Sequence, residues 1–124
     1  ANIFVAQFIG TPKMNILPLN SENIVSDNKI NFLGNEIIFQ KTKFEKKNYF
    51  LGIRPEHFNV SNGSEFKFKP KIDLVENLGN EKIVYMSNDN LELSAKISSQ
   101  VDFQNELNFD LKDIFIFDEN GSRI

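Results

Sequence analysis

Hydrophobic and polar residues alternate along short stretches of the chain, and turn-forming residues separate these stretches. The alternation has a period of two, which is typical of strands that bury one face. Many short strands spaced by roughly 8–12 residues predict an all-β fold, either a small barrel or a sandwich. The expected strands cover residues 14–19, 21–25, 29–33, 36–40, 49–54, 66–78, 82–87, 91–97, 107–111 and 114–117.

The longest expected strand covers residues 66–78, with Pro70 as a bend. Its apolar residues are predicted to face the core and its lysines to face the solvent. An alternation of Phe and Lys could also present a base-stacking face to nucleic acid, but the amphipathic strand is favoured. The apolar residues of this stretch are Phe66, Phe68, Ile72, Leu74 and Leu78.

The first residues follow a helical pattern instead. Ile3, Phe4 and Phe8 recur at helical spacing, and Gly10 and Pro12 end the pattern. We interpret residues 1–13 as a short helix and linker, and residues 14–124 as the domain. A helix of about two turns is marginal in water, so it must pack on this domain or on a preceding one. The start at Ala1, in mid-pattern, favours a missing N-terminal neighbour.

Composition narrows the functional class. The chain has 13 Phe, 2 Tyr and no Trp, and Phe fills a core without a polar group to satisfy. The absence of Cys excludes disulfides and thiol chemistry. A net charge of −3 argues against generic nucleic-acid binding, which favours a basic surface. No apolar run approaches the ~20 residues needed to cross a bilayer.

Two motifs interrupt the strands. The first is Gly52-Ile53-Arg54-Pro55-Glu56-His57, in which Pro55 stops a strand, and the second is Val75-Glu76-Asn77-Leu78-Gly79-Asn80-Glu81, which turns at a glycine. His57 is the chain's only histidine, so it is expected at a structural turn rather than as a base or pH switch. Arg54 and Glu56 are expected to pair locally, or with carbonyls and amides of adjoining strands, rather than to bind an anionic effector. Glu76 and Glu81 alone are weak evidence for a metal site.

Two further segments are ambiguous. Lys41, Lys43, Lys46 and Lys47 are expected to lie in a solvated loop, although they could contact lipid phosphates. The run Ile114-Phe115-Ile116-Phe117 is apolar on both faces of a strand, so it is either central in the fold or a possible interface with another subunit.

Four groups of residues, in matching order along the whole chain, resemble one known family. They are Phe4-Val5-Ala6 through Phe8-Ile9-Gly10 with Pro12, Met14 and Asn15; the Gly52–His57 motif; Val75-Glu76 with Leu78-Gly79 and Glu81; and Phe117-Asp118 with Gly121 and Arg123-Ile124. The chain is similar to the C-terminal regulatory domain in the ATP-binding subunits of bacterial ABC importers, of the maltose and sn-glycerol-3-phosphate transporter type. Gln7 departs from the family, which more often has Gly there.

The resemblance implies a small OB-like barrel of the TOBE type, without a catalytic role. Its signature residues would be structural or regulatory: Gly52, Arg54, Pro55, Glu56, His57, Glu76, Leu78, Gly79 and Glu81. The phosphate-binding loop pattern G-x-x-x-x-G-K-[ST] is absent from the sequence, so ATP and Mg would bind elsewhere in the parent chain.

The resemblance also implies partners and a location. Two such domains would contact each other in a homodimer, next to the parent's nucleotide-binding domains. The importer's membrane subunits would be indirect partners, a regulatory protein a possible one, and nucleic acid none. The location would be cytoplasmic, on the inner face of the membrane. The alternative is a barrel that senses an oxyanion or a sugar phosphate, although no compact Ser/Thr/Gly/Lys cluster marks such a pocket.

Overall fold

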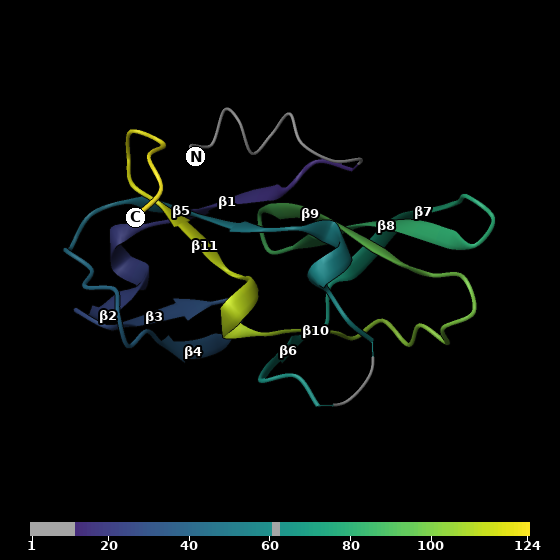
Figure 1. Ribbon diagram of the computed structural model, residues 1–124, viewed down its shortest axis with the longest axis horizontal. Coiled ribbons are helices and arrows are strands. Elements are labelled where there is room, and N and C mark those ends of the chain that lie inside the picture. The colour runs from purple at the N-terminus through teal and green to yellow at the C-terminus, as the bar shows by residue number, and fades with distance from the viewer. Residues whose placement is uncertain (1–11, 61–62) are drawn as a thin grey trace.

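The computed structural model describes residues 12–60 and 63–124 (Figure 1). Short strands and three-residue 3-10 helices make up its regular structure. In chain order these are β1 (Asn15–Leu19), η1 (Ser21–Asn23), β2 (Ile24–Ser26), β3 (Lys29–Phe32), β4 (Asn35–Ile38), β5 (Tyr49–Ile53), η2 (Pro55–His57), β6 (Phe66–Phe68), β7 (Lys71–Asn77), β8 (Glu81–Asn88), β9 (Leu91–Ser98), β10 (Leu107–Phe109), η3 (Leu111–Asp113) and β11 (Phe115–Phe117).

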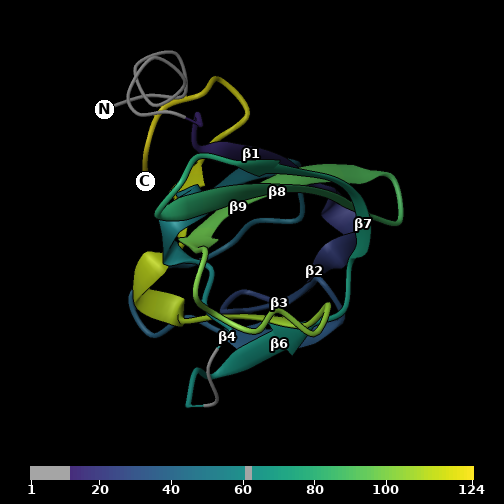
Figure 2. The same cartoon turned by 90° about the vertical axis from the view of Figure 1, so that its right-hand side faces the viewer.

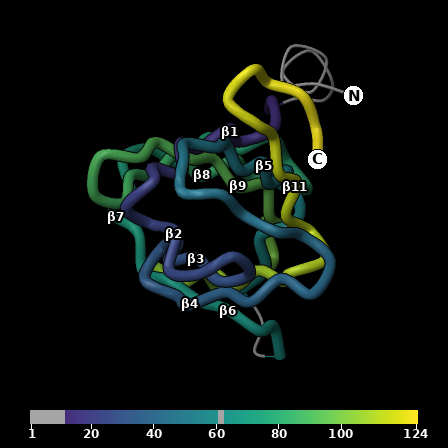
Figure 3. Tube along the Cα trace, turned by 90° about the vertical axis from the view of Figure 1, so that its left-hand side faces the viewer, coloured from purple at the N-terminus to yellow at the C-terminus, as the bar shows by residue number. Residues whose placement is uncertain are grey.

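The strands of the described part form four small antiparallel sheets. Their strand orders are β1-β5-β11, β2-β3-β4, β6-β10 and β7-β8-β9. Viewed along the long axis, β1, β8 and β9 lie on one side of the body, and β3, β4 and β6 on the opposite side (Figure 2). From the other end, β5 and β11 lie beside β1 and β9 (Figure 3). The all-β prediction is confirmed, and the arrangement is compatible with a small OB-like barrel whose sheets do not close into one ladder.

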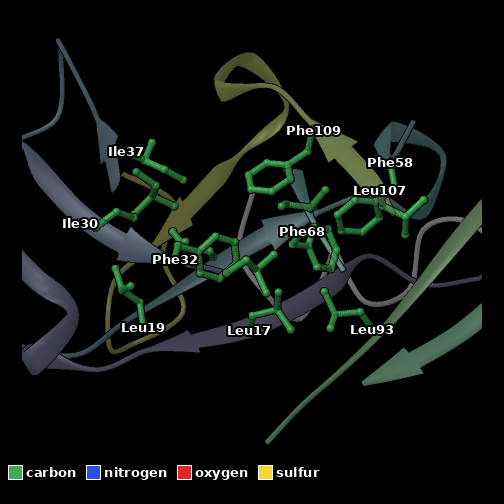
Figure 4. Packing of buried hydrophobic residues seen from close by; sticks show 14 of the residues in the cluster. Leu17, Leu19, Ile30, Phe32, Ile37, Phe58, Phe68, Leu93, Leu107 and Phe109 are labelled. Atoms are coloured by element: carbon green, nitrogen blue, oxygen red, sulfur yellow. The ribbon is translucent and has the colours of Figure 1, made fainter. Parts of the chain in front are cut away.

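One hydrophobic core lies between these sheets, and Phe109 of β10 is at its centre. The Phe109 ring contacts four other rings at centroid distances of 5.4–6.2 Å, mostly edge to face. Those rings come from two strands, β3 and β6, and from the segment after η2, so side chains rather than a continuous ladder unite the sheets (Figure 4). The four rings belong to Phe32, Phe58, Phe66 and Phe68.

Strand β5 is apolar on both faces. Leu51 and Ile53 are fully buried in the main core. Gly52 faces the opposite way, where Met14 and Phe117 form a second, smaller cluster. A Cβ on Gly52 would lie 2.6 Å from Met14 Sδ and 3.0 Å from Phe117 Cε2. Glycine therefore allows close packing on this outer face.

Three expected strands are wrong in detail. The expected strand 107–111 ends at Phe109, and Leu111 begins the 3-10 helix η3. Residues 66–78 do not form one strand, because β6 pairs with β10 whereas β7 pairs with β8. The buried Pro70 separates β6 from β7, and a proline cannot donate to either ladder. In the expected strand 21–25, Ser21–Asn23 instead forms the 3-10 helix η1, which Asn20 precedes as a capping residue.

The expected N-terminal helix and its helix stop at Gly10 lie outside the described residues. The division of the chain into a linker over residues 1–13 and a domain over residues 14–124 stays a prediction. Among residues 12–60 and 63–124, no helix is long and apolar enough to cross a membrane.

Candidate functional site

The first motif runs from β5 into η2. Arg54 is the N-cap residue of η2, and its carbonyl accepts a hydrogen bond from the His57 amide at 3.0 Å. Pro55 is buried at the first helical position, where its missing amide proton costs nothing. Glu56 is exposed and forms no ion pair within the described residues. The local Arg54–Glu56 pairing that the sequence suggested is therefore not found.

His57 of η2 lies beside Asp113 of η3. Its Nδ1 lies 3.7 Å from Asp113 Oδ1, a distance too long for a good hydrogen bond. This nitrogen is buried and has no hydrogen-bond partner among the described residues. The Asp113 side chain is 14% exposed and that of His57 is 37% exposed, so the contact lies at the edge of the core. His57 thus lies in the 3-10 turn η2, and its structural role stays a prediction.

The second motif forms the turn between β7 and β8. Gly79 has φ +93°, a left-handed conformation that favours glycine, and the Leu78 amide donates to the Glu81 carbonyl at 2.8 Å. Glu76 projects into solvent from β7, whereas Glu81 forms an ion pair with Lys96 at 3.4 Å. The two carboxylates are thus in different surroundings.

Strand β7 has a free edge, since its sheet ends there in the order β7-β8-β9. Leu74, Val75 and Leu78 are 60%, 41% and 54% exposed. The expected burial of Leu74 and Leu78 is therefore wrong. We call residues 71–78 the β7 edge.

The predicted interface segment is largely covered by the chain itself. Ile116 and Phe117 are 5% and 1% exposed, and Ile114 and Phe115 are half-buried. Strand β11 lies at the edge of its sheet next to β5, and on its other side it meets only the C-terminal segment, through the isolated bridge between Phe117 and Arg123. Burial in this domain accounts for Ile116 and Phe117, and an interface through Ile114 and Phe115 stays a prediction.

Both arginines of the chain contact the ring of Phe115. The Arg54 and Arg123 Cζ atoms lie 5.6 Å and 4.5 Å from its centroid. The motif residue Arg54 is thus brought to the C-terminal segment. The role of Arg123 could not be found from the sequence, because its contact depends on how residues 118–124 fold back on β11.

The lysine cluster is partly engaged by its own chain. Lys46 Nζ donates to the Ile24 carbonyl at 2.6 Å, and Lys47 Nζ pairs with Glu119 Oε1 at 3.2 Å. The hydrogen bond to Glu119 raises the pKa of the Lys47 ammonium above its ordinary value. Lys41 and Lys43 are exposed.

The candidate residues do not converge on one catalytic constellation. The turn of the β7–β8 hairpin lies at one end of the molecule, on the right of Figure 1, and the C-terminal segment lies toward the other end. The arrangement offers two surfaces for contact, the β7 edge and the arginine pair on Phe115.

Comparison with known proteins identifies relatives of one kind. No family model matches the chain. It is 38% identical over 91 residues to the maltose/maltodextrin import ATP-binding protein MalK of Vibrio cholerae, covering 69% of this chain and 24% of that protein. It is 31% identical over 136 residues to the sn-glycerol-3-phosphate import ATP-binding protein UgpC of Psychromonas ingrahamii, covering 99% of this chain and 35% of that protein. It is 28% identical over 131 residues to the alpha-glucoside transport ATP-binding protein AglK of Rhizobium meliloti, covering 98% and 36%.

The chain thus spans between a quarter and just over a third of the length of the curated relatives it matches. Partial coverage of this kind, together with the all-β fold, fits a C-terminal domain of such proteins. The chain belongs to the family of the ATP-binding subunits of ABC importers.

Proposed function

We propose that this chain is the non-catalytic C-terminal regulatory and dimerisation domain of the ATP-binding subunit of an importer for sugars or sn-glycerol 3-phosphate. The observation that carries the proposal is the match to UgpC along 99% of the chain. On this proposal ATP and Mg bind to the parent's nucleotide-binding domain, next to the importer's membrane subunits on the cytoplasmic face. The chain itself turns over no nucleotide.

The β7 edge is the surface that best suits self-association. A free strand edge presents unpaired backbone donors and acceptors, and the β7 edge adds three exposed apolar side chains to them. An antiparallel second copy would place the strand end that carries Lys71 beside the end that carries Glu76, so their charges attract. A lasting contact between two copies of this domain raises the effective concentration of the two parent nucleotide-binding domains for each other.

Light scattering coupled to size-exclusion chromatography, over a concentration series, tests the dimerisation. We expect the wild-type chain to shift from monomer toward dimer as its concentration rises. Val75→Lys should prevent the shift, because a lysine on a strand edge opposes edge pairing. Val25→Lys is the matched control, since Val25 is 49% exposed on the edge strand β2.

Two results would contradict the dimerisation: a strict monomer at high micromolar concentration, or equal loss of dimer in Val25→Lys. A phosphate-release assay tests the other half of the proposal. Nucleotide hydrolysis by the purified chain would overturn the non-catalytic assignment.

A further inference from the structure

Both arginines of this chain meet at one aromatic ring. The sequence contains twelve lysines and only two arginines, Arg54 and Arg123. Their Cζ atoms lie 5.6 Å and 4.5 Å from the Phe115 centroid, so they can be no farther apart than the sum of these distances.

The backbone fixes this arrangement. Phe115 lies opposite Gly52 in the β5–β11 ladder, and Arg54 follows Gly52 by two residues at the end of β5. Arg123 forms an isolated bridge with Phe117, and the next amide, that of Ile124, donates to the Ile116 carbonyl at 3.0 Å. Arg54 is half-buried and Arg123 is exposed, so the site is accessible from solvent.

The two positive charges have no carboxylate partner within the part of the chain that the structure describes. Acidic residues of the flanking segments are engaged elsewhere: Asp118 Oδ1 accepts the Ser122 amide at 2.9 Å, and Glu119 pairs with Lys47. The face of a Phe ring attracts a cation only weakly at an exposed site. Two like charges held on one ring repel each other, and a bound anion would remove this cost.

We propose that Arg54 and Arg123 bind the phosphate group of a small molecule, with Phe115 as the platform that orients them. A planar guanidinium donates two parallel hydrogen bonds to phosphate oxygens, which a lysine ammonium does not match. Two arginines supply the charge that balances a phosphate dianion, whereas a carboxylate would leave one of them unbalanced. The site is independent of the β7 edge, so it stands or fails apart from dimerisation.

A nitrogen–proton correlation spectrum of the full chain tests the site directly, because it contains only two arginine Nε–Hε signals. The chain is titrated with inorganic phosphate, with glycerol 3-phosphate and, at matched ionic strength, with sodium chloride. We expect both arginine signals to shift along one common saturating curve with at least one phosphate compound and not with chloride. The compound that saturates at the lower concentration distinguishes free phosphate from a phosphate ester as the source.

Charge-conserving variants test the geometry. Arg54→Lys and Arg123→Lys should each weaken phosphate binding roughly tenfold. Each variant loses one of the two parallel charge-assisted hydrogen bonds that a guanidinium donates to phosphate. Lys112→Gln, which removes an exposed cation from η3, should leave the affinity unchanged. Shifts that do not saturate, different affinities at the two signals, or undiminished binding by both lysine variants would overturn the proposal. The wild-type titration decides the question even if a variant fails to fold.

Discussion

At the scale of single residues, the side chain of Asn15 joins two sheets by hydrogen bonds to their backbones. Its Oδ1 accepts the Ser94 amide at 2.7 Å, and its Nδ2 donates to the Ser94 carbonyl at 2.9 Å. Nδ2 also donates to the Ile53 carbonyl at 3.0 Å. The amide group thus bonds to β9 as a neighbouring strand's peptide would, and it links the β1-β5-β11 sheet to the β7-β8-β9 sheet.

We expect Asn15→Ala to lower the free energy of unfolding by about 1–3 kcal/mol, because it leaves the buried Ser94 amide without its acceptor. Urea denaturation followed by circular dichroism measures this change. Asn31→Ala, at an exposed position of β3, should change the stability by less than about 0.5 kcal/mol. Equal effects of the two substitutions would show that the Asn15 contacts contribute nothing particular.

At the scale of elements, two strands of one sheet differ in what they bury. Strand β9 lies against the core, with Leu93, Ala95 and Ile97 all at most 5% exposed. Strand β7 lies at the other side of the same sheet, and beyond Ile72 its side chains are exposed. A register shift between Ile72 and Leu74 marks the point where β7 leaves the core, as bulges often do at sheet edges.

This difference predicts opposite outcomes for one substitution in the two strands. Leu93→Ala should lower the free energy of unfolding by about 2–5 kcal/mol, because it leaves a cavity in the core. Leu74→Ala should lower it by less than about 0.5 kcal/mol in the monomer, since Leu74 is 60% exposed. Denaturant titration at a concentration below dimer formation measures both. A large loss in Leu74→Ala would mean that β7 is covered in the monomer.

At the scale of the whole molecule, one core unites four small sheets. Every sheet contributes side chains to the main cluster, from Leu17 of β1 to Phe109 of β10. A sheet of two or three short strands is marginal alone in water, so no sheet should remain folded when the shared core opens. The described part of the chain should therefore unfold as one unit.

We expect coincident unfolding curves from far-ultraviolet circular dichroism and from tyrosine fluorescence. The two tyrosines report on different sheets, Tyr49 on β5 and Tyr85 on β8. Phe109→Leu should shift both curves to lower denaturant by the same amount, equivalent to about 1–2 kcal/mol, because its ring contacts residues of several elements. Two separated transitions would show that the sheets unfold independently.

Local patterns along the chain were enough to predict most elements. The alternation around residues 82–87 and 91–97 predicted β8 and β9 to within one residue at each end. Such strands were readable because each buries alternate residues and ends at turn-forming residues. The turn at Gly79 and the end of β5 before Pro55 were likewise set by backbone preferences of single residues, which a sequence displays directly.

The sequence by itself determined the all-β class, most strand positions and the family resemblance, because these depend on residues close together in the chain. Tertiary structure alone decided that Pro70 divides two sheets, that Leu74 and Leu78 are exposed, and that Arg54 and Arg123 share the Phe115 ring. The physical reason is that burial and charge pairing depend on which distant segments pack together. A period of two says that a strand has two faces, but only its neighbours in space determine whether either face is covered.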